Sequence, residues 1–181
     1  MVGGLLVPQV ASATTVSVVG GQLRVQGQAG EANRIAIVAS GTTYTVSDAG
    51  APITPGTGCG GVPVMCASVT AGFLVLAGDA GDEVEVTAAT AGGIEGGSGD
   101  DEIQGGSGPE EIAGGAGFDE LRGGPGPDSF DGGADRDIVS YEDHSASVQV
   151  TLEDMRTTGP SPSRTTSSPR SRMSSAGPAA I

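Results

Sequence analysis

Acidic side chains recur at a fixed interval in the second half of the chain. From Gly96 to Ser140 the sequence divides without a gap into five units of nine residues: GGSGDDEIQ, GGSGPEEIA, GGAGFDELR, GGPGPDSFD and GGADRDIVS. The sixth position of every unit is an acid, and from Asp79 to Asp143 there are 18 acidic residues against two arginines, a net charge of −16. Carboxylates at this density, with almost no basic partners, indicate cation binding.

The rest of each unit must position these acids. Two glycines open every unit and a third stands at the fourth position, except in the last unit, where Asp135 replaces it. Glycine allows sharp turns that residues with a Cβ avoid. The eighth position is apolar, and the last three residues suffice for a short strand. Its occupants are Ile103, Ile112, Leu121, Phe130 and Val139. We therefore expect a turn and a strand per unit, two units per coil, and a parallel β-roll with a narrow apolar spine.

Stacking of the coils brings acids two units apart into register. Asp101, Asp119 and Asp137 are expected along one edge, and Glu110 and Asp128 along the other. Two carboxylates about 4 Å apart repel by roughly 4 kcal/mol at an effective dielectric constant near 20, so a divalent cation is required. Carboxylates and backbone carbonyls in flexible turns form an all-oxygen site, which suits Ca²⁺ better than the smaller Mg²⁺.

The motif Gly-Gly-x-Gly-x-Asp-x-(apolar)-x resembles the hemolysin-type calcium-binding repeat, also called the RTX nonapeptide repeat, of secreted bacterial toxins, proteases and lipases. The resemblance covers about one quarter of the chain. It implies that the sixth-position side chains bind Ca²⁺ with help from turn carbonyls; these residues are Asp101, Glu110, Asp119, Asp128 and Asp137, with Gly97, Gly99, Gly115, Gly117, Gly124 and Gly126.

Two units depart from the motif. Glu110 stands where Asp is expected, and its longer side chain makes the edge shared with Asp128 the less regular site. Asp135 either strains the last turn or adds a ligand. Upstream, residues 78–84 read as a degenerate turn of the same kind, and Ile94 occupies an eighth position just before the first full unit. We expect both to cap the roll.

The segment from residue 14 to residue 77 alternates apolar and polar residues with a period of two, which predicts half-buried antiparallel strands. Glycines at Gly20-Gly21 and Gly41 are typical of tight hairpins. A loop rich in Gly and Pro contains both cysteines, Cys59 and Cys66. Two cysteines seven positions apart in an exported chain predict a disulfide.

The two ends of the chain differ from this β-rich centre. Residues 1–13, MVGGLLVPQVASA, end in a small-x-small triplet typical of a signal-peptide cleavage site; a buried N-terminal strand is the alternative. The predicted roll extends from residue 78 to a closing strand near residue 152. Residues 153–181 form a predicted disordered tail, because from Met155 onward there is no acid and Arg lies among Ser, Thr and Pro. A shift of reading frame would explain that change of composition.

The composition also narrows the function. A net charge of −14 argues against nucleic acid or an anionic membrane surface as partner, and no apolar run reaches the roughly 18 residues that a membrane span needs. The only histidine, His144, has no catalytic partner set around it, so no enzyme is expected. We predict an all-β, secreted calcium-binding protein with a structural or adhesive role and an unidentified cell-surface or extracellular partner. The alternative is a fragment of an RTX-type hydrolase, protease or lipase whose catalytic domain is absent.

Overall fold

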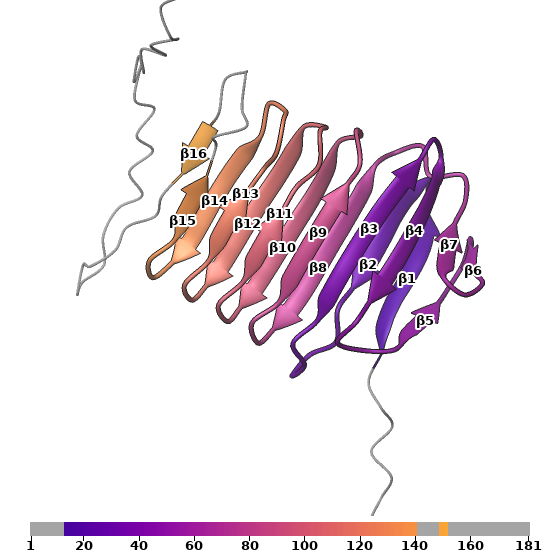
Figure 1. Cartoon of the computed structure of the whole chain (residues 1–181), viewed down its shortest axis with the longest axis horizontal. Helices are drawn as coiled ribbons and strands as arrows, with labels where there is room; N and C mark the ends of the chain where they lie inside the picture. Colours follow the sequence, from indigo (N-terminus) through magenta and orange to yellow (C-terminus); the bar gives the residue numbers. More distant parts are fainter. Residues whose placement is uncertain (1–12, 141–148, 152–181) are drawn as a thin grey trace, which may run out of the picture.

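The computed structural model describes residues 13–140 and 149–151, and in these residues all regular structure is β-strand, as predicted. No helix that could cross a membrane occurs among them. The strands form two eight-stranded sheets (Figure 1). Residues 1–12 of the predicted signal remnant, His144 and the predicted tail lie outside the described residues.

Each sheet contains every second strand of the repeat region. In order across sheet A lie β16 (Gln149–Thr151), β14 (Ser129–Ala134), β12 (Glu110–Ala116), β10 (Gly92–Ser98), β8 (Phe73–Asp79), β2 (Gln22–Gln26), β1 (Thr14–Val19) and β5 (Ile53–Pro55). In order across sheet B lie β15 (Ile138–Ser140), β13 (Glu120–Arg122), β11 (Glu102–Gln104), β9 (Glu83–Thr87), β3 (Arg34–Ser40), β4 (Thr43–Asp48), β7 (Val64–Cys66) and β6 (Cys59–Gly60).

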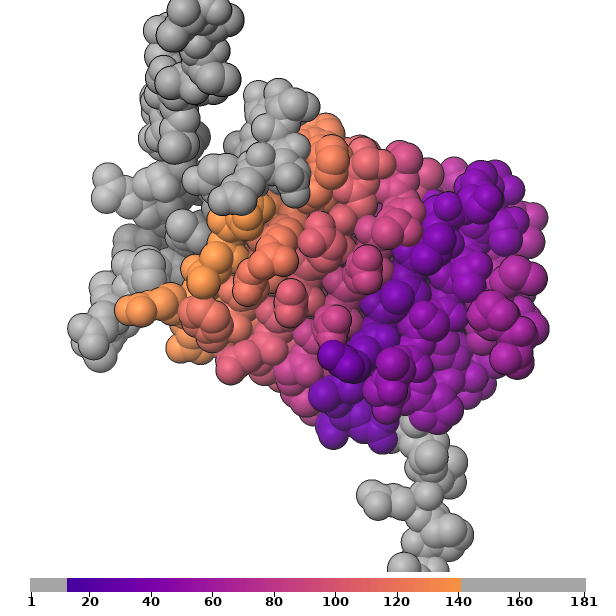
Figure 2. Space-filling model, viewed as in Figure 1, coloured from indigo at the N-terminus to yellow at the C-terminus, as the bar shows by residue number. Residues whose placement is uncertain are grey.

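The repeats form the parallel β-roll that their period predicts. In sheet A, Ile94 pairs with Ile112 and Ile112 with Phe130; in sheet B, Ile103 pairs with Leu121. These side chains are 0–1% exposed and form the apolar spine between the sheets. Successive coils appear as bands of colour from magenta to orange in the space-filling view (Figure 2). The closing strand is β16, which pairs in parallel with β14.

The N-terminal strands continue the same two sheets. The hairpins β1–β2 and β3–β4 are antiparallel as predicted, and Gly20, Gly21 and Gly41 have φ of 59°, 82° and 61°. Strand β2, however, pairs in parallel with β8, and β3 pairs in parallel with β9. Strand β8 runs across the boundary expected at residues 77 and 78. The pairing satisfies the backbone groups that β8 and β9 would otherwise expose at the edge of the roll.

The apolar core is continuous but thicker at the N-terminal end. There it includes large buried side chains such as Leu23, Ile37, Tyr44 and Phe73, whereas each coil of repeats adds one spine residue per strand. The Tyr44 hydroxyl lies 2.5 Å from Thr90 Oγ1, which satisfies its polar end. Because each fully buried large apolar side chain stabilises by about 1.5–3 kcal/mol, the hairpin half contains most of the hydrophobic stabilisation.

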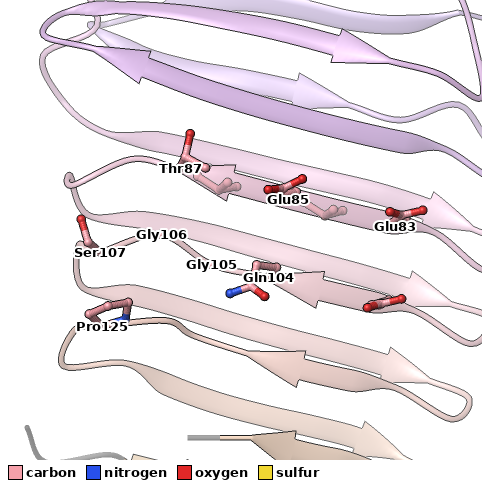
Figure 3. Close-up of a pocket in the computed structure, with 11 residues that line it drawn as sticks. Glu83, Glu85, Thr87, Gln104, Gly105, Gly106, Ser107 and Pro125 are labelled. Atoms are coloured by element: carbon pink, nitrogen blue, oxygen red, sulfur yellow. The ribbon is translucent and has the colours of Figure 1, made fainter. Parts of the chain in front are cut away.

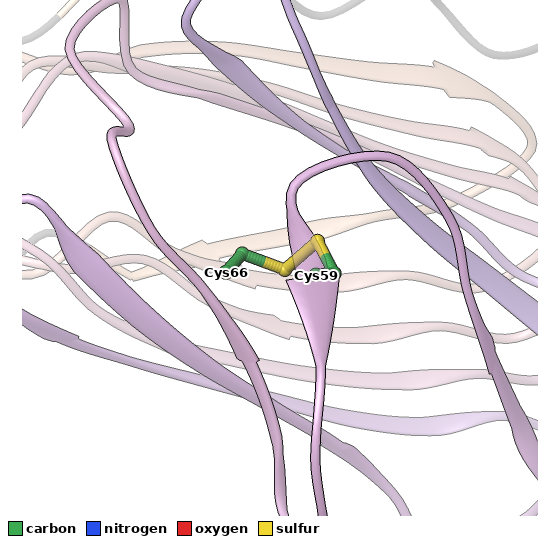
Figure 4. Close-up of a disulfide and its surroundings, with 2 residues drawn as sticks. All are labelled: Cys59 and Cys66. Carbon is green, nitrogen blue, oxygen red and sulfur yellow. A yellow bond between two sulfur atoms is a disulfide. The ribbon is translucent and has the colours of Figure 1, made fainter.

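Cys59 and Cys66 form the predicted disulfide (Figure 4). They face each other across the antiparallel pair β6–β7, and Cys66 is fully buried against the core. Strand β7 also pairs with β4, so the disulfide joins the last two strands of sheet B at the end opposite the repeats. It restrains a loop that has little apolar packing of its own.

Replacing both cysteines, as Cys59→Ala/Cys66→Ala, is expected to lower the free energy of unfolding of the hairpin half by roughly 2–3 kcal/mol, because the unfolded chain regains the entropy of a small ring. Urea unfolding followed by circular dichroism measures this change. Wild-type protein treated with a reducing agent is the control and should lose a similar amount; equal unfolding midpoints for variant and oxidised wild type would contradict the prediction.

Candidate metal-binding turns

Turns of the roll gather along two edges. The first edge, where the chain passes from sheet A to sheet B, consists of residues 78–82, 97–101, 115–119 and 133–137. The second edge, where it passes from sheet B to sheet A, consists of residues 88–91, 105–109 and 123–127, with the carboxylates of Glu110 and Asp128 just after its turns. The sixth-position acids thus divide between the edges as the stacking of the coils predicts.

Backbone amides link the acids of each edge into a ladder. On the first edge the amide of Asp82 donates to Asp101 Oδ1 at 2.8 Å, that of Asp101 to Asp119 Oδ1 at 3.0 Å, and that of Asp119 to Asp137 Oδ1 at 3.2 Å. On the second edge the amide of Glu110 donates to Asp128 Oδ1 at 2.8 Å. One oxygen of each accepting carboxylate is therefore held by the preceding coil.

Other carboxylate oxygens at these edges are buried without a donor. They are Oδ2 of Asp82, Asp101 and Asp119, and these side chains are 0–3% exposed. A buried acceptor without a partner costs roughly 1–3 kcal/mol, and more when it is charged. Oxygen atoms in this condition fit a hard cation, which would supply the missing positive charge.

The first-position glycines make room for these oxygens. A Cβ at Gly96 would lie 2.3 Å from Asp101 Oδ2, and a Cβ at Gly114 would lie 2.3 Å from Asp119 Oδ2. The carboxylate therefore folds back over the start of its own turn, into space that any other residue type would fill. This contact explains the glycine at the first position of these units.

Backbone carbonyls line the same turns and face along the stack. A Cβ at Gly115 would lie 2.0 Å from the Gly97 carbonyl oxygen, and one at Gly117 would lie 2.2 Å from the Gly99 carbonyl oxygen. On the second edge, a Cβ at Gly124 would lie 2.2 Å from the carbonyl oxygen of the glycine one coil earlier, and the same holds at Gly126. Among the described residues no three His, Cys, Asp or Glu side chains converge, so an ion bound here would draw on these carbonyls.

Burial makes negative charge costly at both edges. It raises the pKa of Asp101 to about 7, and the carboxylates of Asp119, Asp82 and Asp100 add a smaller increase. The hydrogen bond from the backbone N–H of Asp82 lowers this pKa but does not cancel the effect of burial. Burial and the charge of Asp128 raise the pKa of Glu110 to about 8. The pKa values of Asp82, Asp119 and Asp137 are raised as well, mainly by burial.

The fourth position of the first-edge turns has positive φ whatever residue stands there. Gly99 and Gly117 have φ of 122° and 131°, while Asp135 has φ of 79° and Ala80 has φ of 82°. The left-handed backbone at Asp135 is the strain expected for that departure, and aspartate tolerates this region better than most residues. Ala80 shows that the degenerate turn before the repeats adopts the same geometry.

The outer face of sheet B has a shallow depression, lined by Glu83, Glu85 and Thr87 of β9 and by Gln104 of β11 (Figure 3). Its acids are exposed, and Glu83 pairs with Arg34 at 2.7 Å. Exposed pairs of this kind contribute at most about 1 kcal/mol. The depression has neither buried charge nor unpaired buried oxygen, in contrast to the two edges.

Comparison with known families identifies the repeats. The RTX calcium-binding nonapeptide repeat (4 copies) matches residues 94–121 and 113–142. The chain contains RTX calcium-binding repeats. The match covers about a quarter of the chain, as the resemblance of the motif indicated, and both edges carry turns of this repeat. No curated protein and no solved structure matches the chain.

Two members of the first-edge ladder lie outside the matched residues. Asp82 takes a full place in the ladder, although the sequence indicated only a degenerate turn there. Asn33 precedes β3, and its backbone N–H donates to Asp82 Oδ1 at 2.6 Å. The spacing of Asp82 from Asp101 is 19 residues instead of 18, and Asn33 belongs to no repeat, so only strand pairing reveals these positions.

Without metal, the roll is expected to lose stability as pH rises. Asp101 and Glu110 have pKa values of about 7 and about 8 in the folded chain, above the ordinary values of 3.8 and 4.5. Groups with raised pKa favour the folded state at low pH, and this contribution is lost as pH rises through the folded-state pKa. Thermal unfolding in metal-stripped buffer should give a lower Tm at about pH 9 than at about pH 5.

Glu110→Gln serves as the control for this pH dependence, because it removes one of the two groups while keeping nearly the same shape. The variant should show a smaller fall in Tm between about pH 7 and about pH 9 than the wild type. A wild-type Tm that rises over the same interval would mean that the buried carboxylates do not control stability.

Proposed function

We propose that this protein is a secreted calcium-binding repeat protein whose roll folds when Ca²⁺ binds and which acts as a structural or adhesive module. The observation that carries the proposal is the series of buried carboxylate oxygens without donors at Asp82, Asp101 and Asp119, in turns that belong to or continue the RTX repeats. The repeats themselves are a structural calcium-binding module, and we propose no catalytic role for the chain.

The proposed ligands are the sixth-position carboxylates together with turn carbonyls. They are Asp101, Glu110, Asp119, Asp128 and Asp137, with Gly97, Gly99, Gly115, Gly117, Gly124 and Gly126, and Asp82 is added because its free oxygen is equivalent to that of Asp101. Bound Ca²⁺ supplies positive charge that offsets repulsion along each edge. The chain's part is to hold the oxygens in register through the amide ladder and to leave space over the first-position glycines.

The apolar core is distributed unequally between the hairpin half and the repeats, and we propose that this makes folding of the repeats depend on calcium. The repeats have one spine side chain per strand and most of the buried acids, whereas the hairpin half has the larger apolar cluster and the disulfide. Charge repulsion therefore opposes folding most strongly where burial of apolar surface is smallest. We propose that strands β10 to β15 require Ca²⁺ and that β1 to β4 do not.

Export is supported by the disulfide and by the proposed metal. Disulfides persist in oxidising compartments outside the cytosol, and extracellular calcium modules typically bind at about 10⁻⁴–10⁻³ M. A secreted location provides both conditions. A fragment of an RTX-type hydrolase, protease or lipase is the second proposal, because the resemblance of the motif extends to those secreted enzymes; the sequence that adjoins this chain in its gene separates the two.

Adding Ca²⁺ to metal-free protein is expected to protect backbone amides of β10 to β15 against hydrogen exchange, with a midpoint of about 10⁻⁴–10⁻³ M. Amides of β1 to β4 should be protected before calcium is added. The same concentration of Mg²⁺ should protect the roll far less, because Mg²⁺ demands a rigid octahedral site. Unchanged exchange up to about 10 mM Ca²⁺ would refute the proposal, since that lies well above the expected range.

Asp119→Asn tests the site itself, because Asp119 lies in the middle of the first-edge ladder, between Asp101 and Asp137. The variant should raise the calcium midpoint by about tenfold or more, which corresponds to about 1.4 kcal/mol. Glu95→Gln is the matched control: Glu95 is exposed on β10, and its loss should leave the midpoint unchanged. Equal midpoints for both variants would show that the edge carboxylates do not bind the ion.

A further inference from the structure

The first-edge ladder begins one turn before its first acid, at Asn33. Strand β3 pairs with β9 so that Arg34 lies opposite Glu83, which makes Asn33 the counterpart of Asp82. The backbone N–H of Asn33 donates to Asp82 Oδ1 at 2.6 Å, as the backbone N–H of Asp82 donates to Asp101 Oδ1 at 2.8 Å. Asn33 is therefore the first residue of the ladder, with a neutral side chain in place of a carboxylate.

The side-chain nitrogen of Asn33, Nδ2, occupies the position that a carboxylate oxygen without a donor has in later turns. A Cβ at Gly27 would lie 2.9 Å from Asn33 Nδ2, whereas a Cβ at Gly96 would lie 2.3 Å from Asp101 Oδ2. Gly27 and Gly96 hold the same register position. Gly27 follows Gln26 and Gly96 follows Glu95, and both Gln26 and Glu95 pair with Leu76. At this place the nitrogen donates hydrogen bonds, whereas an oxygen could only accept them.

Four oxygen atoms surround Asn33 Nδ2. They are the carbonyl oxygen of Ala77 at 3.0 Å, Asp82 Oδ1 at 3.0 Å, the carbonyl oxygen of Glu31 at 3.1 Å and the carbonyl oxygen of Gln28 at 3.4 Å. An amide has only two hydrogens to donate, so the shell holds more acceptors than the group can satisfy. Three carbonyls and one carboxylate from two adjacent coils are the kind of oxygen set that suits a hard cation.

The neighbours also fix which way the amide points. Asn33 Oδ1 faces a donor, the backbone N–H of Gln28 at 3.4 Å, while Nδ2 faces the four acceptors. The side chain is fully buried, and so is Thr14, whose hydroxyl contacts the Asp48 carboxylate. A carboxylate at position 33 would thus lie between Asp48 and Asp82, buried and without the two hydrogens that Nδ2 provides.

We infer that Asn33 makes a metal ion unnecessary at its own turn and ends the calcium column at its N-terminal side. Its side-chain N–H groups satisfy oxygens that in the following turns would require Ca²⁺, so the turn between β2 and β3 is complete without an ion. Asp82 Oδ1 accepts hydrogen bonds from the backbone N–H and from Nδ2 of Asn33, while Asp82 Oδ2 has no hydrogen-bond partner. The first calcium ion therefore binds at the turn of Asp82 and Asp101. This inference rests on the proposed function.

The consequence is a preformed template for the roll. Strand β3, which follows this ion-independent turn, pairs in parallel with β9, and each later coil can add to this edge as its own ion binds. Asn33 sets where the metal-dependent part begins, and the identity of one side-chain group, amide or carboxylate, decides whether that turn needs calcium.

Asn33→Asp in the full chain tests the inference, with the number of bound ions measured by equilibrium dialysis against radioactive Ca²⁺. The variant is expected to bind one more ion per chain than the wild type. In metal-stripped buffer it should lose hydrogen-exchange protection in β3 and β9, and Ca²⁺ should restore it. Asn33→Ala is the matched control: it also loses protection, but it should bind no additional ion, and Ca²⁺ should not restore β3.

The outcomes separate this inference from the proposed function. If the wild type binds Ca²⁺ and Asn33→Asp binds the same number of ions, or does not regain protection with Ca²⁺, the inference is wrong and the proposed function stands. If only Asn33→Asp binds Ca²⁺, the wild-type chain has no calcium column for Asn33 to end, and both the inference and the proposed function are wrong. If neither protein binds Ca²⁺, both are wrong.

Discussion

Buried carboxylates stacked along two edges are the constraint on which the rest of the structure depends. Each accepting carboxylate is held by an amide of the preceding coil, yet Asp82, Asp101 and Asp119 keep a buried oxygen with no donor. A coil gains only two spine residues, each worth about 1.5–3 kcal/mol, while burial and neighbouring charges raise the pKa values of Asp101 and Glu110. Apolar burial is therefore opposed by the cost of buried negative charge, and a bound cation would remove that cost.

The hairpin half removes a second difficulty, which is the start of the roll. A parallel coil must present an unpaired strand edge unless another strand covers it. Here β2 and β3 pair with β8 and β9, and their own partners β1 and β4 lead to the short disulfide-linked strands β6 and β7. The thick core and the disulfide lie at this end, so the part of the chain that needs no cation supports the part that has most of the charge.

The sequence predicted the roll, its two edges and the disulfide because each depends on a local pattern. A strict period of nine determines which acids share an edge, so the separation of Asp101 from Glu110 followed directly. The pairing of β2 with β8 could not be predicted, because an alternation of apolar and polar residues tells which face is buried and not which strand lies beside it. Asn33 was missed for the same reason: its place in the ladder comes from the register of β3 with β9, in a turn outside the repeats.

The two edges end differently on the N-terminal side. On the first edge the ladder ends on Asn33, which donates to Asp82. On the second edge the positions in register before Glu110 are Gly92 and Phe73, and a Cβ at Gly92 would lie 2.1 Å from the Phe73 ring. Burial and the charge of Asp128 raise the pKa of Glu110 to about 8, although the backbone amides of Gly108 and Gly106 act in the opposite direction. At its N-terminal end the first edge therefore has a polar side chain that donates to Asp82 Oδ1, whereas the second edge begins at an aromatic ring packed against Gly92.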